Sequence, residues 1–346
     1  MRVSVLDQSP ISEGQSGPDA LAHTLELARL AERLGFHRFW VAEHHGGPML
    51  AGAAPEVLLG AIGSHTQEIR IGSGGVMLPH YSPLKVAETF TLLAGLYPGR
   101  VDLGLGRAAG TDPLTTYALQ RDRRQAAPDD FPDQLTELLG YLDGTLPEDH
   151  PFRRLGDTLP GQPQRPEPWL LGSSAQSAIW AGQLGLPYMF ADFIAPFSEP
   201  LGASYREHFA AAGHPGHRSA RMGVALWAIV AETEEEARYL AAPARMSFRL
   251  LRQGQLIKVP SPETALDYLA KVGQARESWI PGRRALIGTP EQVRSGLEAA
   301  AAAYGAEEVM VVTITHDHAA RMRSYELLAE VCDLGPRLTG SGAAAF

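Results

Sequence analysis

Short apolar runs alternate with longer helical stretches along nearly the whole chain, and this alternation limits the possible folds more than any other feature. The predicted strands cover residues 3–6, 39–42, 69–75, 100–106, 169–172, 188–191, 222–230 and 309–314. A helix is predicted after each strand, at residues 18–34, 55–65, 83–96, 132–142, 174–184, 198–212, 234–248 and 318–331. Strands that alternate with helices form parallel sheets, because each helical crossover returns the chain to the same end of the sheet.

Eight strand–helix units in 346 residues predict an α/β fold, a single-domain (β/α)8 TIM barrel with insertions. A doubly wound open sheet is the alternative, and the number of units and the length favour the barrel. The barrel is expected over residues 1–335, followed by a tail rich in glycine and alanine at 336–346.

Two insertions interrupt the pattern. The first, near 144–168, is rich in proline and glycine and is expected at the stability face of the barrel. The second, near 249–289, follows the seventh helix and includes a short helix at 262–273. It starts from the same face, and a lid folded up over the mouth is the alternative. An additional helix is predicted at 289–305, where Thr and Pro give a helix-start signal.

The composition excludes several classes of function. The net charge is −9 and no long basic run occurs, so a surface for nucleic acid or anionic membranes is not expected. No stretch approaches the roughly 18 apolar residues of a membrane span, and the first residues lack a signal-peptide core. Cys332 is the single cysteine, so no internal disulfide is possible. We therefore expect a cytoplasmic protein.

Two neighbouring strands carry glycines where bulky side chains usually fill a barrel. In the third and fourth predicted strands, the apolar side chains share one side and suit the helices, which directs Gly72, Gly74, Gly104 and Gly106 inward. Inward glycines near two strand ends would leave a flat slot at the mouth, suited to a planar aromatic cofactor. The alternative is that these glycines relieve crowding or form bulges.

The second strand runs into WVAEHHGG, which places an acid and two histidines beside the predicted mouth. The alternation directs Ala42 and His44 inward and separates His44 from His45, so the two imidazoles do not converge on one metal ion. In THDH, after the eighth strand, His316 and His318 are two positions apart, so both imidazoles could face one metal ion. However, this motif equally caps the following helix, and no other strand end supplies an acidic ligand set. We predict no metal site.

The segment LLGSSAQSA reads as a strand, a turn and the start of a helix. Free N–H groups at a helix N-terminus suit a phosphate, and Ser173, Ser174 and Ser177 add hydroxyls; an ordinary helix cap is the alternative. Arg107 follows the fourth strand in GLGRAAG, where it suits a phosphate or a surface ion pair. Because these strand ends are neighbours in the barrel, a compact phosphate site is favoured. GLGRAAG is not a dinucleotide fingerprint in this context.

Taken together, these segments resemble the bacterial-luciferase-like flavin monooxygenases. The similarity is carried, in order, by FWVAEHH, IRIGSGGVMLPHYSPLKVAE, GRVDLGLGRAAG, PWLLGSSAQSA, IGTPEQV and VTITHDHAARMRSYELLAE. It extends from Leu6 to about Leu328 and is specific as an ordered set. The LDQSPI opening is similar to the non-luminous, FMN-dependent branch.

The resemblance implies a TIM barrel that binds reduced FMN at its C-terminal mouth. It also implies that O2 and reduced FMN form a flavin C4a-peroxide, which oxidises a small organic substrate. A separate flavin reductase is expected to supply the reduced FMN. In this resemblance His44 matches the active-site histidine. Gly74 and Gly75 match a pair joined by a non-proline cis peptide bond against the flavin, and Arg107 matches the arginine that approaches the FMN phosphate.

The resemblance also assigns the phosphate-binding turn to the serines of the GSSAQS segment and the edge of the flavin ring to Met189 and Phe190. The catalytic residue is therefore predicted to be His44. The predicted cofactor contacts are Ala42, Gly74, Gly75, Gly106, Arg107, Gly172, Ser173, Ser174, Ser177, Met189 and Phe190.

One residue departs from the luminous enzymes, because Gly106 stands where they carry a reactive cysteine. Light emission is therefore not implied. Some relatives use the deazaflavin F420, which the glycine-lined slot also accepts, but the Ser-rich turn and Arg107 match the FMN branch better. A flavin-binding protein without turnover is a further alternative.

Small residues in the second and third helices are candidates for a homodimer interface, as in dimers of the family. They are Gly60, Ala61, Gly63, Ala87 and Ala94. Packing of these residues within one chain is the alternative.

Overall fold

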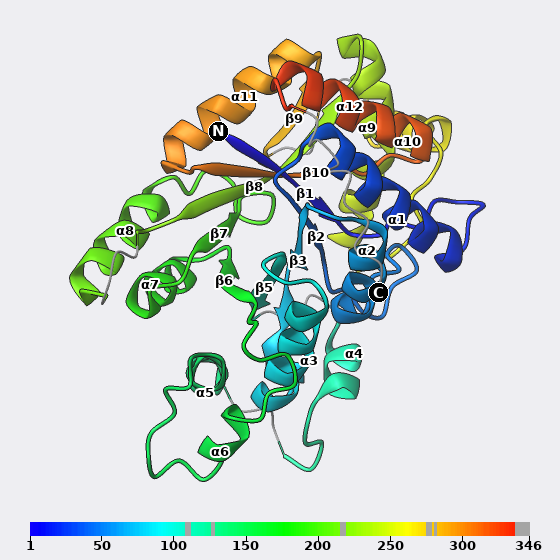
Figure 1. Cartoon of the computed structure of the whole chain (residues 1–346). Helices are drawn as coiled ribbons and strands as arrows, with labels where there is room; N and C mark the ends of the chain where they lie inside the picture. Colours follow the sequence, from blue (N-terminus) through cyan, green and yellow to red (C-terminus); the bar gives the residue numbers. More distant parts are fainter. Residues whose placement is uncertain (108–111, 126–128, 215–218, 275–278, 280–281, 336–346) are drawn as a thin grey trace.

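The predicted strands close into one parallel sheet around a barrel axis (Figure 1). The computed structural model describes residues 1–107, 112–125, 129–214, 219–274, 279 and 282–335. Within these residues the barrel strands are β1 (Arg2–Asp7), β2 (Arg38–Val41), β3 (Arg70–Ser73), β5 (Val101–Gly106), β6 (Glu167–Gly172), β7 (Tyr188–Ala191), β8 (Met222–Val230) and β10 (Glu308–Val312). Strand β10 pairs with β1 on one side and with β8 on the other, which closes the sheet. The (β/α)8 barrel is confirmed and the open sheet is excluded. The predicted tail at 336–346 lies outside the described residues.

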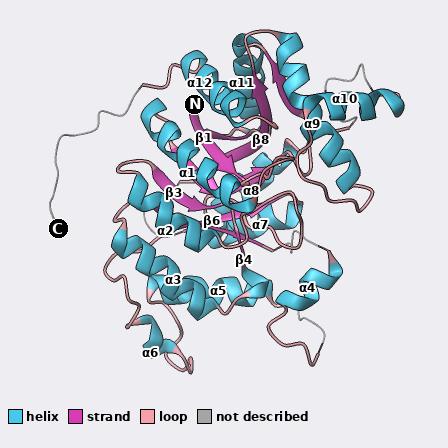
Figure 2. Cartoon of the chain, turned by 90° about the vertical axis from the view of Figure 1, so that its right-hand side faces the viewer, coloured by secondary structure: helices cyan, strands magenta, loops and turns pink. Residues whose placement is uncertain are grey.

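Helices surround the strands, as Figure 2 shows from the side. The ring consists of α1 (Gly17–Leu34), α2 (Pro55–His65), α3 (Pro83–Leu96), α5 (Phe131–Asp143), α7 (Ala175–Leu184), α8 (Pro200–Ala212), α11 (Pro290–Tyr304) and α12 (His318–Val331). Proline in the first turn begins most of these helices, because its missing N–H is not needed there. A left-handed glycine ends α1, α5, α7, α8 and α11, which explains why their ends were predictable.

The segment between β8 and β10 differs from the prediction. Helix α9 (Glu234–Leu251) was expected to belong to the ring, but α11 packs against β8 and α9 packs beside α10 (Pro262–Lys271), as Figure 1 shows. An unpredicted strand, β9 (Ala285–Gly288), pairs with Trp227–Val230 of β8. Two amphipathic helices follow β8, and periodicity does not say which of them covers the barrel. Residues 231–289 are therefore the insertion, called the mouth insertion below.

The mouth insertion begins at the carboxyl end of a strand and reaches the loops at the carboxyl ends of β1 and β2. The N–H of Val259 donates to the carbonyl of Ile11 at 2.9 Å, and the N–H of Glu13 donates to the carbonyl of Val259 at 2.8 Å. The side chain of Leu256 lies beside Gly47, in the loop after β2. The insertion thus crosses part of the mouth, which supports the lid alternative over an insertion confined to the lower face.

The remaining elements are short. Strand β4 (Val76–Met77) pairs with β5, and the 3-10 turn η1 (Leu78–His80) follows it. Helix α4 (Pro113–Leu119) follows β5 at the mouth. Helix α6 (Arg153–Gly156) lies in the first predicted insertion and packs against α5. This insertion connects the end of a helix to the start of β6, so it lies at the face opposite the mouth, as expected.

The core has two layers that follow the alternation of each strand. Phe39, Val41, Ile71 and Leu103 face the helices and are fully buried. Trp40, Trp169, Met189 and Met310 face the barrel interior with at most 2% of their surface exposed. The predicted inward and outward faces of the second to fourth strands are therefore confirmed. Among the described residues, no helix combines the length and the apolar character needed to span a membrane.

Candidate active site

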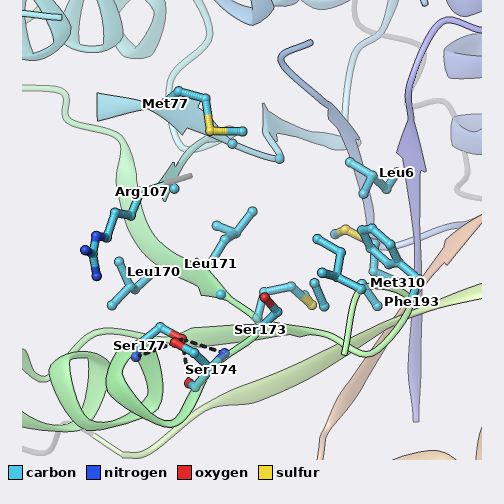
Figure 3. Close-up of a pocket in the computed structure, with 18 of the residues that line it drawn as sticks. Leu6, Met77, Arg107, Leu170, Leu171, Ser173, Ser174, Ser177, Phe193 and Met310 are labelled. Atoms are coloured by element: carbon cyan, nitrogen blue, oxygen red, sulfur yellow. Dashed lines mark hydrogen bonds between the residues drawn. The ribbon is translucent and has the colours of Figure 1, made fainter. Parts of the chain in front are cut away.

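A cavity of about 400 Å³ opens at the carboxyl ends of the strands (Figure 3). Nine predicted cofactor contacts line it: Gly74, Gly75, Gly106, Arg107, Gly172, Ser173, Ser174, Ser177 and Met189. Its other described lining residues are Leu6, Met77, Phe131, Leu170, Leu171, Trp180, Ala191, Phe193, Ile194, Ala225 and Met310. A volume of several hundred Å³ with mostly apolar walls and a few convergent polar groups is typical of a small-molecule site.

The polar groups of the cavity gather where α7 begins. The hydroxyl of Ser174 accepts the N–H of Ser177 at 3.3 Å and caps the helix. This confirms the cap alternative, yet the same serines also line the cavity, so the two interpretations are compatible. The positive end of the α7 dipole adds to their preference for an anion.

Arg107 completes this polar end. Its guanidinium pairs with Asp129 at 3.0 Å and lies over the ring of Trp180, with 5.7 Å between the guanidinium carbon and the ring centre. The Arg107 and Asp129 side chains are 51% and 73% exposed, so their ion pair is weak and solvent-screened. An incoming phosphate can therefore recruit Arg107 at low cost.

The inward glycines divide into two groups. At Gly72 a Cβ atom would lie 2.6 Å from Trp40 Nε1 and 2.7 Å from Asp102 Cβ, and at Gly104 it would overlap the carbonyl oxygen of Ser73 and lie 2.8 Å from Leu171 Cδ1. Gly72 makes room for neighbouring side chains, and Gly104 makes room for the Ser73 backbone and the Leu171 side chain, so for both the crowding alternative is correct. The predicted flat slot for a cofactor therefore does not continue from the mouth into the barrel interior.

The second group reaches the mouth and lines the cavity. The peptide bond between Gly74 and Gly75 is cis, as the resemblance implied. A Cβ atom would lie 2.5 Å from Leu6 Cδ1 at Gly74 and 2.7 Å from the carbonyl oxygen of Gly104 at Gly75. Neither position accepts a side chain without displacement, so bare backbone faces the cavity there.

Three predicted site residues do not line the cavity. The alternation of β7 directs Met189 into the cavity and Phe190 outward, where the Phe190 and Tyr304 ring centres are 5.1 Å apart. The prediction that both residues edge the flavin ring is therefore wrong for the Phe190 side chain. Ala42 is buried in the inner layer below the mouth, and His44 lies in the loop that follows β2.

Glu43 anchors that loop through hydrogen bonds to both of its carboxylate oxygens. One carboxylate oxygen accepts the N–H of Met77 at 3.0 Å, and the other meets His45 Nε2 at 2.8 Å and the Tyr81 hydroxyl at 3.1 Å. Burial raises the pKa of Glu43, and these three hydrogen bonds oppose the increase. Because Met77 lines the cavity, Glu43 ties the histidine segment to the cavity wall.

His44 carries a buried polar atom without a partner. Its Nδ1 is inaccessible and has no hydrogen-bond partner among the described residues. Burial, assisted by the neighbouring His45, lowers the pKa of His44 to about 4. The imidazole is therefore neutral at pH 7 and has a free nitrogen that could accept or donate a hydrogen bond.

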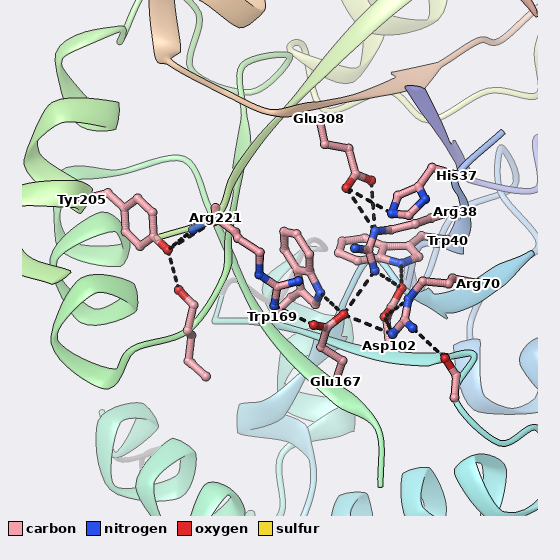
Figure 4. Close-up of polar contacts among 12 residues, drawn as sticks. His37, Arg38, Trp40, Arg70, Asp102, Glu167, Trp169, Tyr205, Arg221 and Glu308 are labelled. Atoms are coloured by element: carbon pink, nitrogen blue, oxygen red, sulfur yellow. Dashed lines mark hydrogen bonds and ion pairs between the residues drawn. The ribbon is translucent and has the colours of Figure 1, made fainter. Parts of the chain in front are cut away.

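The lower end of the barrel is closed by buried ion pairs (Figure 4). Arg38 donates to Asp102 at 2.7 Å and, through Nε, to both oxygens of Glu308 at 3.1 Å. Arg70 pairs with Asp102 and with Glu167, at 3.1 Å in the second case. Arg38, Asp102 and Glu308 are at most 2% exposed.

A tryptophan pair rests on this network and forms the floor beneath the cavity. The indole N–H of Trp40 donates to Asp102 at 2.9 Å. The rings of Trp40 and Trp169 meet edge to face with centres 5.5 Å apart, and the Arg38 guanidinium carbon lies 4.6 Å from the Trp169 ring centre. The described side chains thus fill the barrel interior from below, and the cavity opens above them at the carboxyl end.

The THDH segment has a structural role. Asp317 accepts the N–H of Ala320 at 2.8 Å and caps α12. The ring of His318 stacks on His23 with centres 3.9 Å apart. In the part of the chain that the structure describes, no group of three or more His, Cys, Asp or Glu side chains is arranged to hold a metal ion.

Several lining residues were missed by the sequence analysis. Leu6, Ala225 and Met310 lie on inward positions of predicted strands, so the alternation contained the signal that could have found them. Phe131 and Trp180 come from the ring helices α5 and α7, and only tertiary packing brings them to the mouth.

Comparison with known proteins gives matches along nearly the whole chain. Residues 1–308 match a protein family described as luciferase-like monooxygenase. A luciferase-like monooxygenase of Escherichia coli strain K12 is 38% identical over 339 residues, covering 95% of this chain and 96% of that protein. The N-acetyl-S-alkylcysteine monooxygenase of Bacillus subtilis strain 168 is 38% identical over 330 residues, covering 95% and 98%. The crystal structure of apo-MsnO8 is 42% identical, with a TM-score of 0.87, covering 97% of this chain and 98% of that one.

Replacing Arg38 by leucine tests the closed lower end. The change leaves Glu308 and part of Asp102 as buried charges without their cation, and we expect the free energy of unfolding to fall by roughly 3–5 kcal/mol. Urea denaturation measures the effect. Arg124→Leu is the control, because that side chain is 90% exposed and its ion pair with Asp122 contributes nothing measurable. Equal denaturation midpoints for both variants would contradict the importance of the network.

The lowered pKa of His44 predicts a pH dependence of stability. An unfolded histidine binds a proton below about pH 6.5, whereas folded His44 resists protonation down to about pH 4. The free energy of unfolding should therefore decrease as the pH falls from 6.5 to 4, and it should decrease less in His44→Gln. Urea midpoints at pH 7 and pH 5 measure this difference. His318, whose pKa is also lowered, titrates in both proteins and cancels. Parallel pH profiles would contradict the lowered pKa of His44.

Proposed function

This chain belongs to the luciferase-like monooxygenase family, and we propose that it is an FMN-dependent monooxygenase that uses O2 to oxidise a small organic substrate. The observation that carries the proposal is the arrangement of one cavity. A helix N-terminus and Arg107 suit a phosphate at one side, and the bare backbone of Gly74 and Gly75 faces the same space.

The residues present fit FMN. The serines of the α7 turn and the weakly paired Arg107 can hold the phosphate with charge-assisted hydrogen bonds. The glycines at 74, 75 and 106 and the apolar side chains of Leu171 and Met189 suit a planar aromatic ring system.

Reduced FMN, when bound, supplies the electrons that let O2 react with an organic substrate. The protein contributes binding, orientation and exclusion of water. Apolar walls and the mouth insertion keep water away from the reacting groups. We assign proton handling to His44, because its half-buried imidazole is neutral and its inaccessible Nδ1 has no partner among the described residues, in the segment that Glu43 ties to Met77.

A separate flavin reductase is the proposed source of reduced FMN. The name of the Bacillus subtilis relative makes oxygenation of a thioether the first reaction to assay, in a mixture of this protein, a reductase, NADH, FMN and O2. Substrate-dependent incorporation of labelled oxygen supports a monooxygenase. Flavin binding without any oxygenated product across a panel of thioethers and ketones would favour a binding protein without turnover.

Flavin binding itself is tested with a matched pair of ligands. Arg107→Met should weaken FMN binding by about tenfold or more, the value of one charge-assisted hydrogen bond. It should leave riboflavin binding unchanged, because riboflavin lacks the phosphate. Quenching of flavin fluorescence on titration measures both. Arg124→Met is the control for a general loss of positive charge.

Two outcomes would contradict the FMN proposal. Equal losses of FMN and riboflavin affinity would place the phosphate away from Arg107. Tighter binding of F420 than of FMN by the unmodified protein would favour the deazaflavin alternative, with dehydrogenation in place of oxygenation.

We also propose a homodimer through the outer faces of α2 and α3, where Val57, Leu92 and Leu96 are 69%, 50% and 61% exposed. Of the small residues predicted there, Ala87 and Ala94 are buried within the chain, and a Cβ at Gly63 would overlap Tyr97, so these three pack internally. Gly60 has open space around its Cα.

Sedimentation equilibrium tests this interface. Leu96→Glu should convert a dimer into a folded monomer, because the charge would be buried without a partner. Leu114→Glu is the control, since Leu114 is 78% exposed and belongs to α4 rather than to α2 or α3. A monomeric unmodified protein would refute the proposal.

A further inference from the structure

The cavity has a polar side and an apolar side, and Figure 3 shows them opposite one another. Arg107 and the α7 serines lie on one side, whereas Leu6, Phe193 and Met310 lie on the other. Among the described lining residues, Arg107 is the one with a charged side chain, and the proposed function already uses it for the phosphate.

We propose that the apolar side receives the hydrocarbon part of an uncharged substrate, and that Phe193 determines how long this part can be. The proposal rests on the proposed function, because it takes the polar side to be filled by the FMN phosphate. Burying a charged group against such a wall without a partner is unfavourable, whereas each buried methylene group is favourable.

Phe193 is held in place both through its backbone and through its ring. Its N–H donates to the carbonyl of Ala225 at 3.3 Å, and its carbonyl accepts from Arg283 at 3.4 Å. Its ring meets Trp227 edge to face with centres 5.9 Å apart. A residue fixed in this way is an end wall with a defined position, unlike a side chain that swings away from a longer ligand.

Trp227 is itself fixed from the far side by the mouth insertion. Its ring centre lies 4.9 Å from that of Phe248 on α9 and 6.0 Å from that of Trp279. Both partners belong to residues 231–289, so the insertion braces the end wall from behind. Truncation of Phe193 would therefore open space in front of Trp227, and the wall behind that space would remain.

The test uses the protein loaded with oxidised FMN and two series of probes. The first series is the uncharged methyl n-alkyl sulfides from ethyl to decyl. The second is the matched 3-(n-alkylthio)propanoates, which carry a carboxylate. Perturbation of the flavin absorbance on titration measures binding without turnover.

In the unmodified protein, affinity for the sulfides should rise with chain length, reach a maximum and then fall. The carboxylates should bind at least tenfold more weakly. Phe193→Ala should move the maximum to chains longer by two to four methylene groups, with about fourfold tighter binding for each added group that is buried. Phe193→Trp should move the maximum to shorter chains.

Phe197→Ala is the matched control, because Phe197 is 61% exposed, lies on the same loop and does not line the cavity. It should leave the maximum unchanged. If Phe193→Ala does not fold, Phe193→Leu keeps an apolar side chain against Trp227 and should shift the maximum by a smaller amount in the same direction.

The outcomes separate this proposal from the proposed function. If the unmodified protein fails to bind FMN, the proposed function fails. If FMN binds and the chain-length maximum does not depend on residue 193, the role of Phe193 is refuted. A selective loss of FMN affinity in Phe193→Ala would show that the flavin itself occupies the apolar side. Equal binding of the carboxylates would refute an uncharged substrate.

Discussion

Arg38 is the residue on which the arrangement of the barrel depends most directly. Its guanidinium joins Glu308 of β10 to Asp102 of β5, so one side chain connects strands on opposite sides of the barrel. Buried charges tolerate little displacement, because each must keep its partners in a medium that solvates it poorly. The network therefore fixes the lower end of the barrel as a rigid polar plug and leaves the upper end free to hold a ligand.

Above the plug, tryptophans fill the barrel interior and glycines leave space for a cavity at the mouth. Trp40 donates its indole N–H to Asp102 of the plug and fills the space that Gly72 leaves open. Above it, Gly74 and Gly75 carry no side chains into the mouth. Glu43 holds the adjoining wall through the N–H of Met77. Each layer is supported by the one below, so the groups at the mouth are held in place before any ligand arrives.

Much of this arrangement could be predicted from the sequence, because its signals are local. The boundaries of α2, α3 and α12 coincide with the predicted ones, since proline marks the first turn of α2 and α3 and Asp317 caps α12. The polar end of the cavity was predicted because its residues lie at strand ends.

The misassigned helix after β8 and the position of Phe190 had different causes. To assign the ring helix after β8 correctly, one must know which of two amphipathic helices covers the barrel. The position of Phe190 follows from the strand alternation of β7, because the adjacent residues Met189 and Phe190 cannot share a face. The contribution of Phe131 and Trp180 depends on helix packing that local patterns do not specify.

Strand β8 is longer than its neighbours, and this has a consequence for how the protein can diverge. Barrel closure uses Gly223–Trp227 against β10, while Ala228–Val230 project beyond that pairing and carry β9 and the mouth insertion. The insertion, whose Phe248 and Trp279 pack against Trp227, is thus built on the part of β8 that barrel closure does not use. A change in the length or sequence of this insertion should therefore affect the stability of the eight-stranded barrel little. Ligand selectivity and folding can then change independently in evolution or by engineering.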